Sequence, residues 1–454
     1  MNPTFLFRLL RRRQALLGRV NWSREQLEAH QAQSLAALRR HAYAHSPFYG
    51  RFHRGLEDRP LAELPVLSKG EMMANFDDFV TDRALRLADV DAFLSGFKDD
   101  ERFLGRYFVN ATSGSTGRRG VFVHDEDEWL TILASYARSY AWGGAMPGLT
   151  RRMRMAVVST TTPWHQSALV GASVRSWFTP TLRLNASDPL PEIVARLNAW
   201  QPETLVTYAS MVRLLAEEQL EGRLRIEPRA VFSASEVLTD QTRRRAREVW
   251  GREVFNVYGA TETATIASEC EHHVGMHLFE DLVITEIVDE HNRPVPPGEF
   301  GEKVLVTVLF SRTQPLIRYE MSDSVRASSA VCPSGWSFAM IDGIQGRLQE
   351  VLHLPAKAGG TVAIQPIVFH DVMDIVPVGG WQVVFRPDSL TVLLAGVSPG
   401  FSDEGLVRRL RGALEVRGAI LPPVMVRHVE TIPREVLGKA PLIKSEPALG
   451  NIAL

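Results

Sequence analysis

The chain has 454 residues, a formal net charge of -1 and a hydrophobic content of 45%. This length predicts more than one domain with substantial apolar cores, and the near-neutral charge argues against a basic surface for nucleic acid. No apolar run is long enough to span a bilayer, and only two cysteines, Cys270 and Cys332, occur. Such low cysteine usage argues against a disulfide framework and predicts a soluble, cytoplasmic protein.

The first hundred residues have a mostly helical pattern, with a helix expected over residues 26–44. Residues 5–13 are basic, and no sustained apolar core follows them, so they do not form a secretory signal. Two interpretations of this segment stay open: a solvated helix face and a helix lying on a membrane surface.

Between about residues 108 and 258, apolar runs rich in β-formers alternate with helical stretches. Strands are expected over residues 153–159, 204–208, 230–233 and 254–258. Helices are expected over residues 126–141, 191–200, 211–221 and 240–250. This alternation predicts an α/β fold with mainly parallel sheets.

The pattern changes after residue 280. Residues 282–288 and 303–310 flank a turn rich in proline and glycine, which predicts an antiparallel unit or a small barrel-like β portion. A β-hairpin over residues 381–395, a helix over 402–416 and a strand over 424–429 predict a small α+β unit. We therefore expect a large domain over residues 1–345 and a small, mobile domain over residues 346–454.

One nine-residue segment carries four hydroxyls, three glycines and two arginines: Thr112-Ser113-Gly114-Ser115-Thr116-Gly117-Arg118-Arg119-Gly120. Glycine lets the backbone approach an anion, hydroxyls donate hydrogen bonds and arginine supplies positive charge, which together suit a polyphosphate. A solvated hairpin turn has a similar composition. The segment alone leaves both interpretations open.

Three later segments place reactive side chains after strands or turns. Tyr258 ends an apolar strand and can stack on a purine, and Thr261 with Glu262 can hold a divalent cation. Asp323 can accept both hydrogen bonds of a ribose diol. Lys439, one of only six lysines, can meet negative charge that develops on a phosphate. The alternatives are a strand-end turn, a capping carboxylate and a solvated lysine.

In this order, and with Gly346-Arg347 preceding Lys439, these segments resemble the superfamily of adenylate-forming enzymes, which includes acyl-CoA ligases, luciferases and peptide-synthetase adenylation domains. Within it the chain is most similar to the phenylacetate–CoA ligase branch. The segments that carry this similarity are Ser46-Pro-Phe-Tyr49, Ser233-Ala-Ser-Glu236, Gly275-Met-His-Leu-Phe-Glu-Asp281, Glu286-Ile287 and Pro315-Leu-Ile-Arg-Tyr319. The resemblance extends from about residue 35 to residue 439.

The resemblance implies roles for individual residues. ATP would be bound by Thr112, Ser113, Gly114, Ser115, Thr116, Gly117, Arg118, Ser235, Glu236, Tyr258, Gly259, Asp323 and Arg347. Thr261 and Glu262 would face Mg²⁺, and Lys439 would bridge ATP and the acid. The acid site would be lined by His165, Tyr208 and Ala234, and Gln349 would be the hinge of the small domain.

The implied reaction is attack of a carboxylate oxygen, from an acid that we expect to be aromatic, on the α-phosphate, giving acyl-AMP and pyrophosphate. A thiol, with CoA the first choice, would then take the acyl group. Gln349 and residues 351–357 depart from the pattern of related ligases, so a carrier-protein thiol or an amine stays open as acceptor. A catalytically silent binding homologue is a further alternative. The sequence leaves the oligomeric state open, including a dimer.

The two cysteines lie at positions that bind zinc in some members of the phenylacetate–CoA ligase branch. Cys270, His272, His277 and Cys332 could supply the four ligands that a structural zinc ion favours. The alternative is a decayed site with inert cysteines, because Cys332-Pro333-Ser334-Gly335 lacks a second cysteine.

Overall fold

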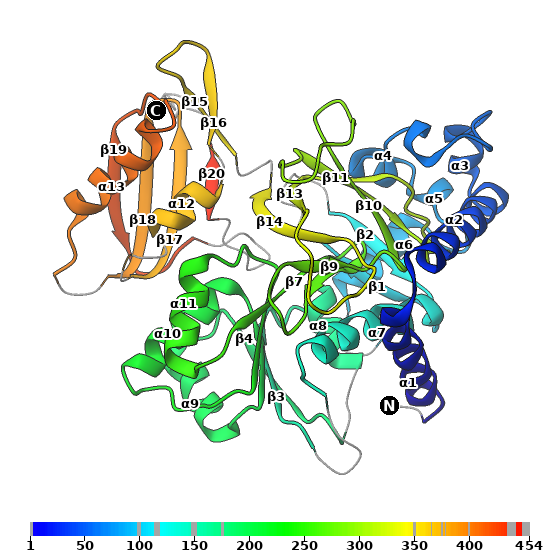
Figure 1. Ribbon diagram of the computed structural model, residues 1–454, viewed down its shortest axis with the longest axis horizontal. Coiled ribbons are helices and arrows are strands. Elements are labelled where there is room, and N and C mark those ends of the chain that lie inside the picture. The colour runs from blue at the N-terminus through cyan, green and yellow to red at the C-terminus, as the bar shows by residue number, and fades with distance from the viewer. Residues whose placement is uncertain are drawn as a thin grey trace.

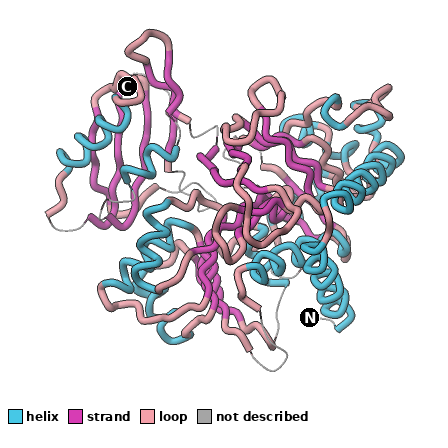
Figure 2. The backbone as a smooth tube through the Cα atoms, in the orientation of Figure 1, coloured by secondary structure: helices cyan, strands magenta, loops and turns pink. Residues whose placement is uncertain are grey.

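The structure is a computed structural model that describes residues 3–97, 101–112, 119–146, 152–173, 177–347, 351–364, 366–373, 376, 378–397, 400–433 and 442–446 (Figures 1 and 2). Its helices are α1 (Pro3–Gly18), α2 (Arg24–His45), α3 (Pro47–Phe52), α4 (Lys69–Ala74), α5 (Phe76–Phe79), α6 (Leu87–Ser95), α7 (Glu126–Trp142), α8 (Gln166–Ser173), α9 (Leu190–Trp200), α10 (Ala209–Leu220), α11 (Asp240–Trp250), α12 (Pro366–Met373) and α13 (Asp403–Glu415), with short 3₁₀ turns at Arg19–Asn21 and Leu61–Glu63.

The strands are β1 (Phe108–Ala111), β2 (Val121–His124), β3 (Met155–Ser159), β4 (Thr181–Asn185), β5 (Thr204–Thr207), β6 (Ala230–Ala234), β7 (Val254–Ala260), β8 (Ala264–Glu269), β9 (Met276–Leu278), β10 (Val283–Val288), β11 (Lys303–Val308), β12 (Tyr319–Met321), β13 (Asp323–Ser328), β14 (Met340–Arg347), β15 (Leu352–Pro355), β16 (Thr361–Ile364), β17 (Val378–Arg386), β18 (Ser389–Val397), β19 (Val424–Val429) and β20 (Ile443–Ser445).

The largest described sheet is mixed, with the strand order β13-β14-β9-β8-β7-β6-β5-β3-β4. The strands from β4 to β7 are parallel, as the alternating sequence predicts, and the strands from β7 to β13 pair antiparallel. The change of direction occurs at β7, because only three residues connect it to β8. Such a short connection makes a hairpin, whereas a parallel neighbour needs a crossover of a dozen residues or more.

Helices cover both faces of the parallel strands, which is why these strands are continuous apolar runs. Helices α9, α10 and α11 pack on one face through a shared core that includes Leu197, Leu215 and Ala246. On the other face, Phe232 and Phe255 pack against the C-terminal half of α7. The parallel strands are therefore buried between helical layers, and only their ends are available to a ligand.

The remaining part of the large unit combines the N-terminal helices with two smaller sheets. The hairpin β1–β2 and the three-stranded sheet β10-β11-β12 share one apolar core with helices α1 to α7. The antiparallel pair predicted around residues 282–310 is β10 with β11. Among the described strands this sheet stays open, so the alternative of a small barrel is not realised; β12 pairs with β11 and β10 has no further strand partner.

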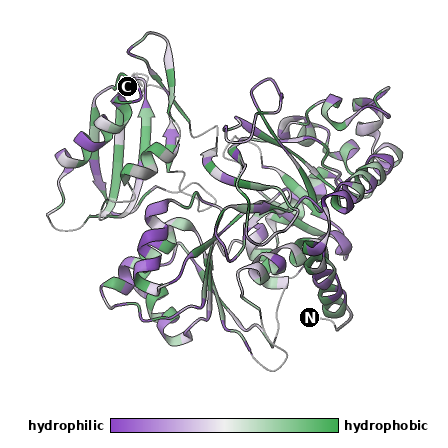
Figure 3. Ribbon diagram, viewed as in Figure 1, coloured by the Kyte–Doolittle hydropathy of each residue, from purple (hydrophilic) through white to green (hydrophobic). Residues whose placement is uncertain are grey.

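Residues 352–443 contribute a separate apolar core, formed by the sheet β19-β18-β17-β20 with helices α12 and α13. In Figure 3 the strands of both units are mainly hydrophobic and the outer helix faces are hydrophilic. Both guanidinium ends of Arg213, on α10, donate to the Val378 carbonyl at the start of β17, at 3.3 Å each. Within the described residues, no helix combines the length and apolarity needed to cross a membrane.

Candidate active site

The ends of the parallel strands place most of the described site residues at one edge of the large sheet. Strand pairing puts Thr207, Ser233 and Asn256 side by side in β5, β6 and β7. The predicted residues Tyr208, Ala234 and Tyr258 follow these positions within two residues and therefore lie at the same edge. In open α/β sheets this carboxyl edge is where ligands bind.

Tyr258 connects two of the predicted nucleotide segments. Its hydroxyl donates to the Asp323 carboxylate at 3.0 Å across 65 residues of chain, and its ring is 8% exposed. Asp323 opens β13 and faces Arg347 across the β13–β14 pair, so the backbone brings both predicted ribose residues together. Gly259 has a steric role, because a Cβ there would lie 2.6 Å from the Ala264 carbonyl oxygen.

The turn that follows β7 holds Thr261 and Glu262. The Tyr319 hydroxyl donates to the Glu262 carboxylate, and burial together with this negative charge raises the pKa of Tyr319 well above its usual value. The Thr261 carbonyl accepts a hydrogen bond from Gln166 Nε2 at 3.1 Å. Side chains from other segments thus fix the backbone and the carboxylate of this turn.

The base of the Ser/Thr/Gly-rich segment is described at Thr112, Arg119 and Gly120. The Thr112 hydroxyl accepts hydrogen bonds from the Gly120 N–H at 2.9 Å and from Lys69 Nζ at 3.1 Å. Lys69 opens α4, 43 residues before Thr112. The guanidinium of Arg119 lies 4.4 Å from the ring centre of Trp164. This base therefore carries two cationic side chains, one of them a lysine that the sequence did not assign to the site.

The predicted acid-site residues lie around the ends of β3, β5 and β6. His165 is buried and stacks on Trp164 with ring centres 4.6 Å apart. The Tyr208 hydroxyl accepts from the Thr160 N–H at 2.9 Å, which ties the end of β5 to the end of β3. Next to His165, Gln166 accepts a hydrogen bond from the Tyr136 hydroxyl at 2.8 Å. Gln166 and Tyr136 add polar groups that sequence reasoning missed.

Two predicted nucleotide residues, Ser235 and Glu236, have distinct local settings. Ser235 is exposed and has a φ of 69°, a left-handed conformation that is uncommon outside glycine. The Glu236 carboxylate accepts from the Ser210 N–H at 2.8 Å, in the first turn of α10. The Glu236 carboxylate therefore binds a backbone N–H at the N-terminus of α10.

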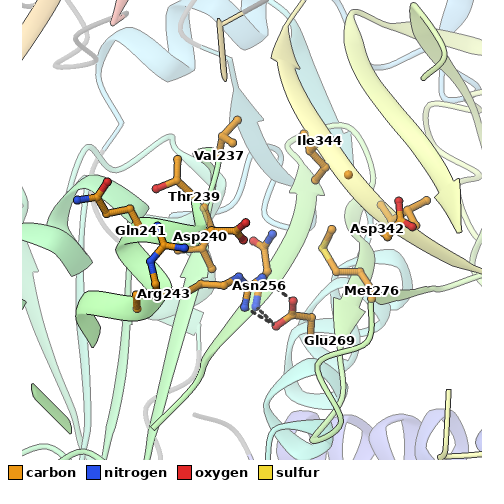
Figure 4. A pocket seen from close by; sticks show the side chains of 15 residues that line it. Val237, Thr239, Asp240, Gln241, Arg243, Asn256, Glu269, Met276, Asp342 and Ile344 are labelled. Carbon is orange, nitrogen blue, oxygen red and sulfur yellow. Dashed lines mark hydrogen bonds and ion pairs between the residues drawn. The ribbon is translucent and has the colours of Figure 1, made fainter. Parts of the chain in front are cut away.

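A cavity of about 590 Å³ lies between α11, β7 and β14 (Figure 4). Asn256 lines it, two residues before Tyr258 and so on the same face of β7. Glu269 also lines it, accepts from the Asn256 N–H at 3.0 Å and pairs with Arg243 at 2.5 Å. Burial disfavours its charged form, but the bonds from His273 and Arg243 hold the pKa of Glu269 below its usual value.

The predicted metal ligands do not all meet. Cys270, His277 and Cys332 are buried with their ligand atoms within 4.8 Å of one another, and the two sulfurs lie 3.6 Å apart. Burial raises the pKa of the Cys270 thiol to about 11 and lowers the pKa of His277 to about 4. Among the described residues, neither ring nitrogen of His277 has a partner that meets hydrogen-bond geometry. His272 is exposed, outside this group of three, because the turn after Cys270 directs it to the surface.

Several predicted residues lie outside the described residues: Ser113, Gly114, Ser115, Thr116, Gly117, Arg118, Gln349 and Lys439. Their assignments stay predictions. For Arg347 the structure describes the backbone position given above.

Comparisons with known proteins give one family model and several relatives that are similar to this chain. A family model described as AMP-binding enzyme matches residues 106–307. The phenylacetate-coenzyme A ligase of Thermus thermophilus is 26% identical over 386 residues, which cover 80% of this chain and 79% of the relative. The phenylacetate-coenzyme A ligase of Escherichia coli is 26% identical over 353 residues, which cover 72% of each chain.

Among solved structures, 2-hydroxyisobutyryl-CoA ligase in the postadenylation state, in complex with R3-HIB-AMP, matches with a TM-score of 0.71 at 19% identity. The match covers 94% of this chain and 91% of that chain. ATP-bound MatB from Rhodopseudomonas palustris matches with a TM-score of 0.50 at 17% identity and covers 73% of this chain. At these identities the structural matches establish a shared fold.

Proposed function

We infer the reaction from one premise: this chain belongs to the superfamily of adenylate-forming enzymes, in its phenylacetate–CoA ligase-like branch. It is an AMP-forming ligase, which activates a carboxylic acid with ATP as acyl-AMP, releases pyrophosphate and transfers the acyl group to CoA. We further propose that the acid is aromatic, as in the relatives named phenylacetate-coenzyme A ligase.

The observation that best supports a nucleotide site is the hydrogen bond between Tyr258 and Asp323. It holds a carboxylate that can accept both hydroxyls of a ribose beside an aromatic ring that can contact a base. Asn256, on the same strand face, offers an amide donor and acceptor to a base edge. Glu262, held by Tyr319, is the proposed Mg²⁺ ligand, since a carboxylate beside phosphates is the usual protein ligand of that ion.

These residues would act mainly by positioning the acid and ATP and by stabilising negative charge on the phosphates. The carboxylate of the acid must approach the α-phosphate in line with the leaving pyrophosphate. We propose that Lys69 and Arg119, at the base of the Ser/Thr/Gly-rich segment, add positive charge on the phosphate side, and that His165, Tyr208 and Ala234 border the acid.

The first half-reaction is tested by acid-dependent exchange of labelled pyrophosphate into ATP, with a panel of aryl and aliphatic acids. We expect exchange with aryl acids, and a several-fold higher kcat/KM for them than for aliphatic acids of similar size. Exchange with aliphatic acids only would contradict the aryl proposal. No exchange with any acid would favour a catalytically silent binding protein instead.

The second half-reaction separates CoA from the other acceptors that the sequence leaves open. The enzyme is incubated with acid, ATP and either CoA, a phosphopantetheinylated carrier protein or an amine, and the acyl product is identified by mass spectrometry. We expect an acyl-CoA thioester. Product formation with only a carrier protein or an amine would show a loading enzyme or an amide synthetase.

We also propose that Cys270, His277 and Cys332 bind a structural zinc ion. Two sulfurs and one imidazole are ligands that zinc prefers, and their ligand atoms lie within 4.8 Å of one another in a buried position. The ion would join the β8–β9 turn to the segment between β13 and β14. His272 is not part of this proposal.

Zinc content tests this site without reference to activity. We expect about one zinc per chain by elemental analysis after purification without chelators, and a loss of most of it in C332A. The matched control is H272A, which removes an exposed histidine two residues from Cys270 and should keep the zinc. A wild-type protein without zinc, or equal zinc in C332A, would remove the proposal. The cytoplasmic location and the oligomeric state stay predictions.

A further inference from the structure

A buried glutamine, Gln314, holds the hairpin that carries the Ser/Thr/Gly-rich segment. Its side-chain oxygen accepts from the Val123 N–H and its side-chain nitrogen donates to the Val121 carbonyl, both at 3.0 Å. The side chain therefore bonds the edge of β2 in the way a neighbouring strand would. Gln314 is 2% exposed, so no water replaces these two bonds.

The backbone around Gln314 is itself fixed from both sides. Thr313 donates its N–H and its hydroxyl to the buried Glu128 carboxylate on α7, at 2.8 and 2.6 Å. The Ser311 hydroxyl donates to the Gln314 carbonyl at 2.7 Å, and the Tyr49 hydroxyl donates to the Pro315 carbonyl at 2.9 Å. Because the backbone of Gln314 is held in place, its side-chain amide can hold β2 in one position.

The same segment continues directly into the nucleotide side of the site. Within nine residues after Gln314 it reaches Tyr319, which bonds Glu262, and Asp323, which bonds Tyr258. On the other side of Gln314, β2 follows Gly120, whose N–H bonds the Thr112 hydroxyl. Residues 314–323 therefore contact both the hairpin that is proposed to bind phosphate and the residues that are proposed to bind the ribose and Mg²⁺.

We propose that Gln314 is a positioning residue that sets the base of the phosphate-binding hairpin relative to Asp323 and Glu262. This inference rests on the proposed function, since it assigns the two sides of the site to one nucleotide. Its consequence is specific. Loss of the amide displaces Thr112 and Gly120 from the ribose and metal side, which weakens ATP binding and leaves the acid site intact.

The test is Q314M, which keeps an unbranched side chain of similar length beside Met72 and Met73 but removes both amide bonds. We expect the KM for ATP in the exchange assay to rise about tenfold, since two buried backbone groups lose their partners. The KM for the acid should stay within about twofold of wild type. Deuterium exchange of peptides covering residues 119–125 should become faster, because the Val123 amide loses its acceptor.

The matched control is T313V, which removes a hydrogen bond to Glu128 from the adjacent residue without touching β2. We expect T313V to lose stability yet keep the wild-type KM for ATP. A folded Q314M with an unchanged KM for ATP would overturn the proposal, even if its deuterium exchange were faster.

Two further outcomes are distinguishable. If Q314M does not fold, Q314E keeps the acceptor for the Val123 N–H but faces the Val121 carbonyl with a carboxylate that cannot donate when it is ionised, and a rise in the KM for ATP is expected at a pH at which it is ionised. An unchanged KM in folded Q314E would then overturn the proposal. If the wild type shows no exchange with any acid, the proposed function fails, while the ATP dissociation constants of wild type and Q314M still decide the role of Gln314.

Discussion

Lys69 illustrates how a side chain can contact a predicted site segment that lies far from it in the sequence. Its ammonium donates to the hydroxyl of Thr112, and its Cε lies 3.1 Å from where a Cβ on Gly120 would be. This close approach leaves little room for a side chain at position 120 and places the compact ammonium of Lys69 at the base of the segment. A positive charge at the base of a phosphate-binding segment strengthens anion binding.

We therefore predict that K69M lowers kcat/KM for ATP in the exchange assay by about tenfold or more, the scale of one charged hydrogen bond. K69R should not restore it fully, because a planar guanidinium does not reproduce the contact that the compact ammonium makes with Thr112. The control is K357M, which replaces a lysine of the small unit whose ammonium donates to the Glu415 carbonyl at 3.5 Å. Wild-type kinetics in K69M would remove Lys69 from the site.

At this scale the sequence predicted residue types well and contacts poorly. Tyr258 and Asp323 were both identified by type, but their hydrogen bond depends on where the sheet places β13 relative to β7, and these two strands are not neighbours in it. His272 was predicted as a ligand because it is close to Cys270 in sequence, and the structure places it at the surface. Short spacing along the chain does not fix the direction of a side chain in a turn.

At the scale of elements, α7 connects the layers of the large unit through one buried ion pair. Arg138 and Asp281 form two bonds of 2.9 Å, both side chains are fully buried, and the guanidinium lies 3.8 Å from the ring centre of Phe279. Arg19, after α1, adds a third bond to the same carboxylate. Although burial disfavours ionisation, these two arginines hold the pKa of Asp281 below its usual value.

We predict that R138M destabilises the protein by about 3–5 kcal/mol, because it leaves Asp281 buried with only Arg19 as a partner. R19M should cost much less, since Arg19 is partly exposed. The double variant R138M/D281L should recover most of the loss, because an apolar pair removes the need for a buried charge. Urea unfolding measures all three. A loss of less than about 1 kcal/mol in R138M would contradict this account.

The helices and strands of the α/β part were largely predictable, since the alternation of apolar runs follows from burial on both faces. The helix predicted over residues 240–250 is α11 (Asp240–Trp250). The antiparallel half of the sheet was not predicted from the sequence, although Gly259 is one residue that could have indicated it. That glycine looks like the start of a turn, but β7 continues through it to Ala260, and its missing side chain lets β8 approach. Sequence alone does not separate these two uses of glycine.

At the scale of the whole molecule, the apolar core of residues 352–443 is separate from the three apolar cores of the large unit. One polar contact between the two units is the bond from Arg213 to the Val378 carbonyl, which links α10 to β17 in the small unit. Interfaces of this kind permit relative movement of two units. The predicted boundary at residues 345–346 precedes the end of β14 by one to two residues and remains a prediction about the hinge.

The small unit matters for function because the chain between β19 and β20 contains Lys439, outside the described residues. The described residues that are predicted to bind the nucleotide belong to the large unit, with Arg347 on β14 of its large sheet, so a lysine supplied by the small unit would complete the site only when the two units come together. Its charge would then act on the phosphate as negative charge develops there. This is a role in the transition state, which differs from a role in binding ATP.

We therefore predict that K439A keeps the ATP dissociation constant within about twofold of wild type but lowers the rate of acid-dependent pyrophosphate exchange by at least about a hundredfold. The matched control is K444A, a lysine five residues later on β20, where it pairs with Val384 in the sheet. K444A should keep exchange, which separates the loss of one specific charge from a general change in the small unit. Unchanged exchange in K439A would show that the large unit completes adenylation alone, and that the small unit acts only in the transfer to the acceptor.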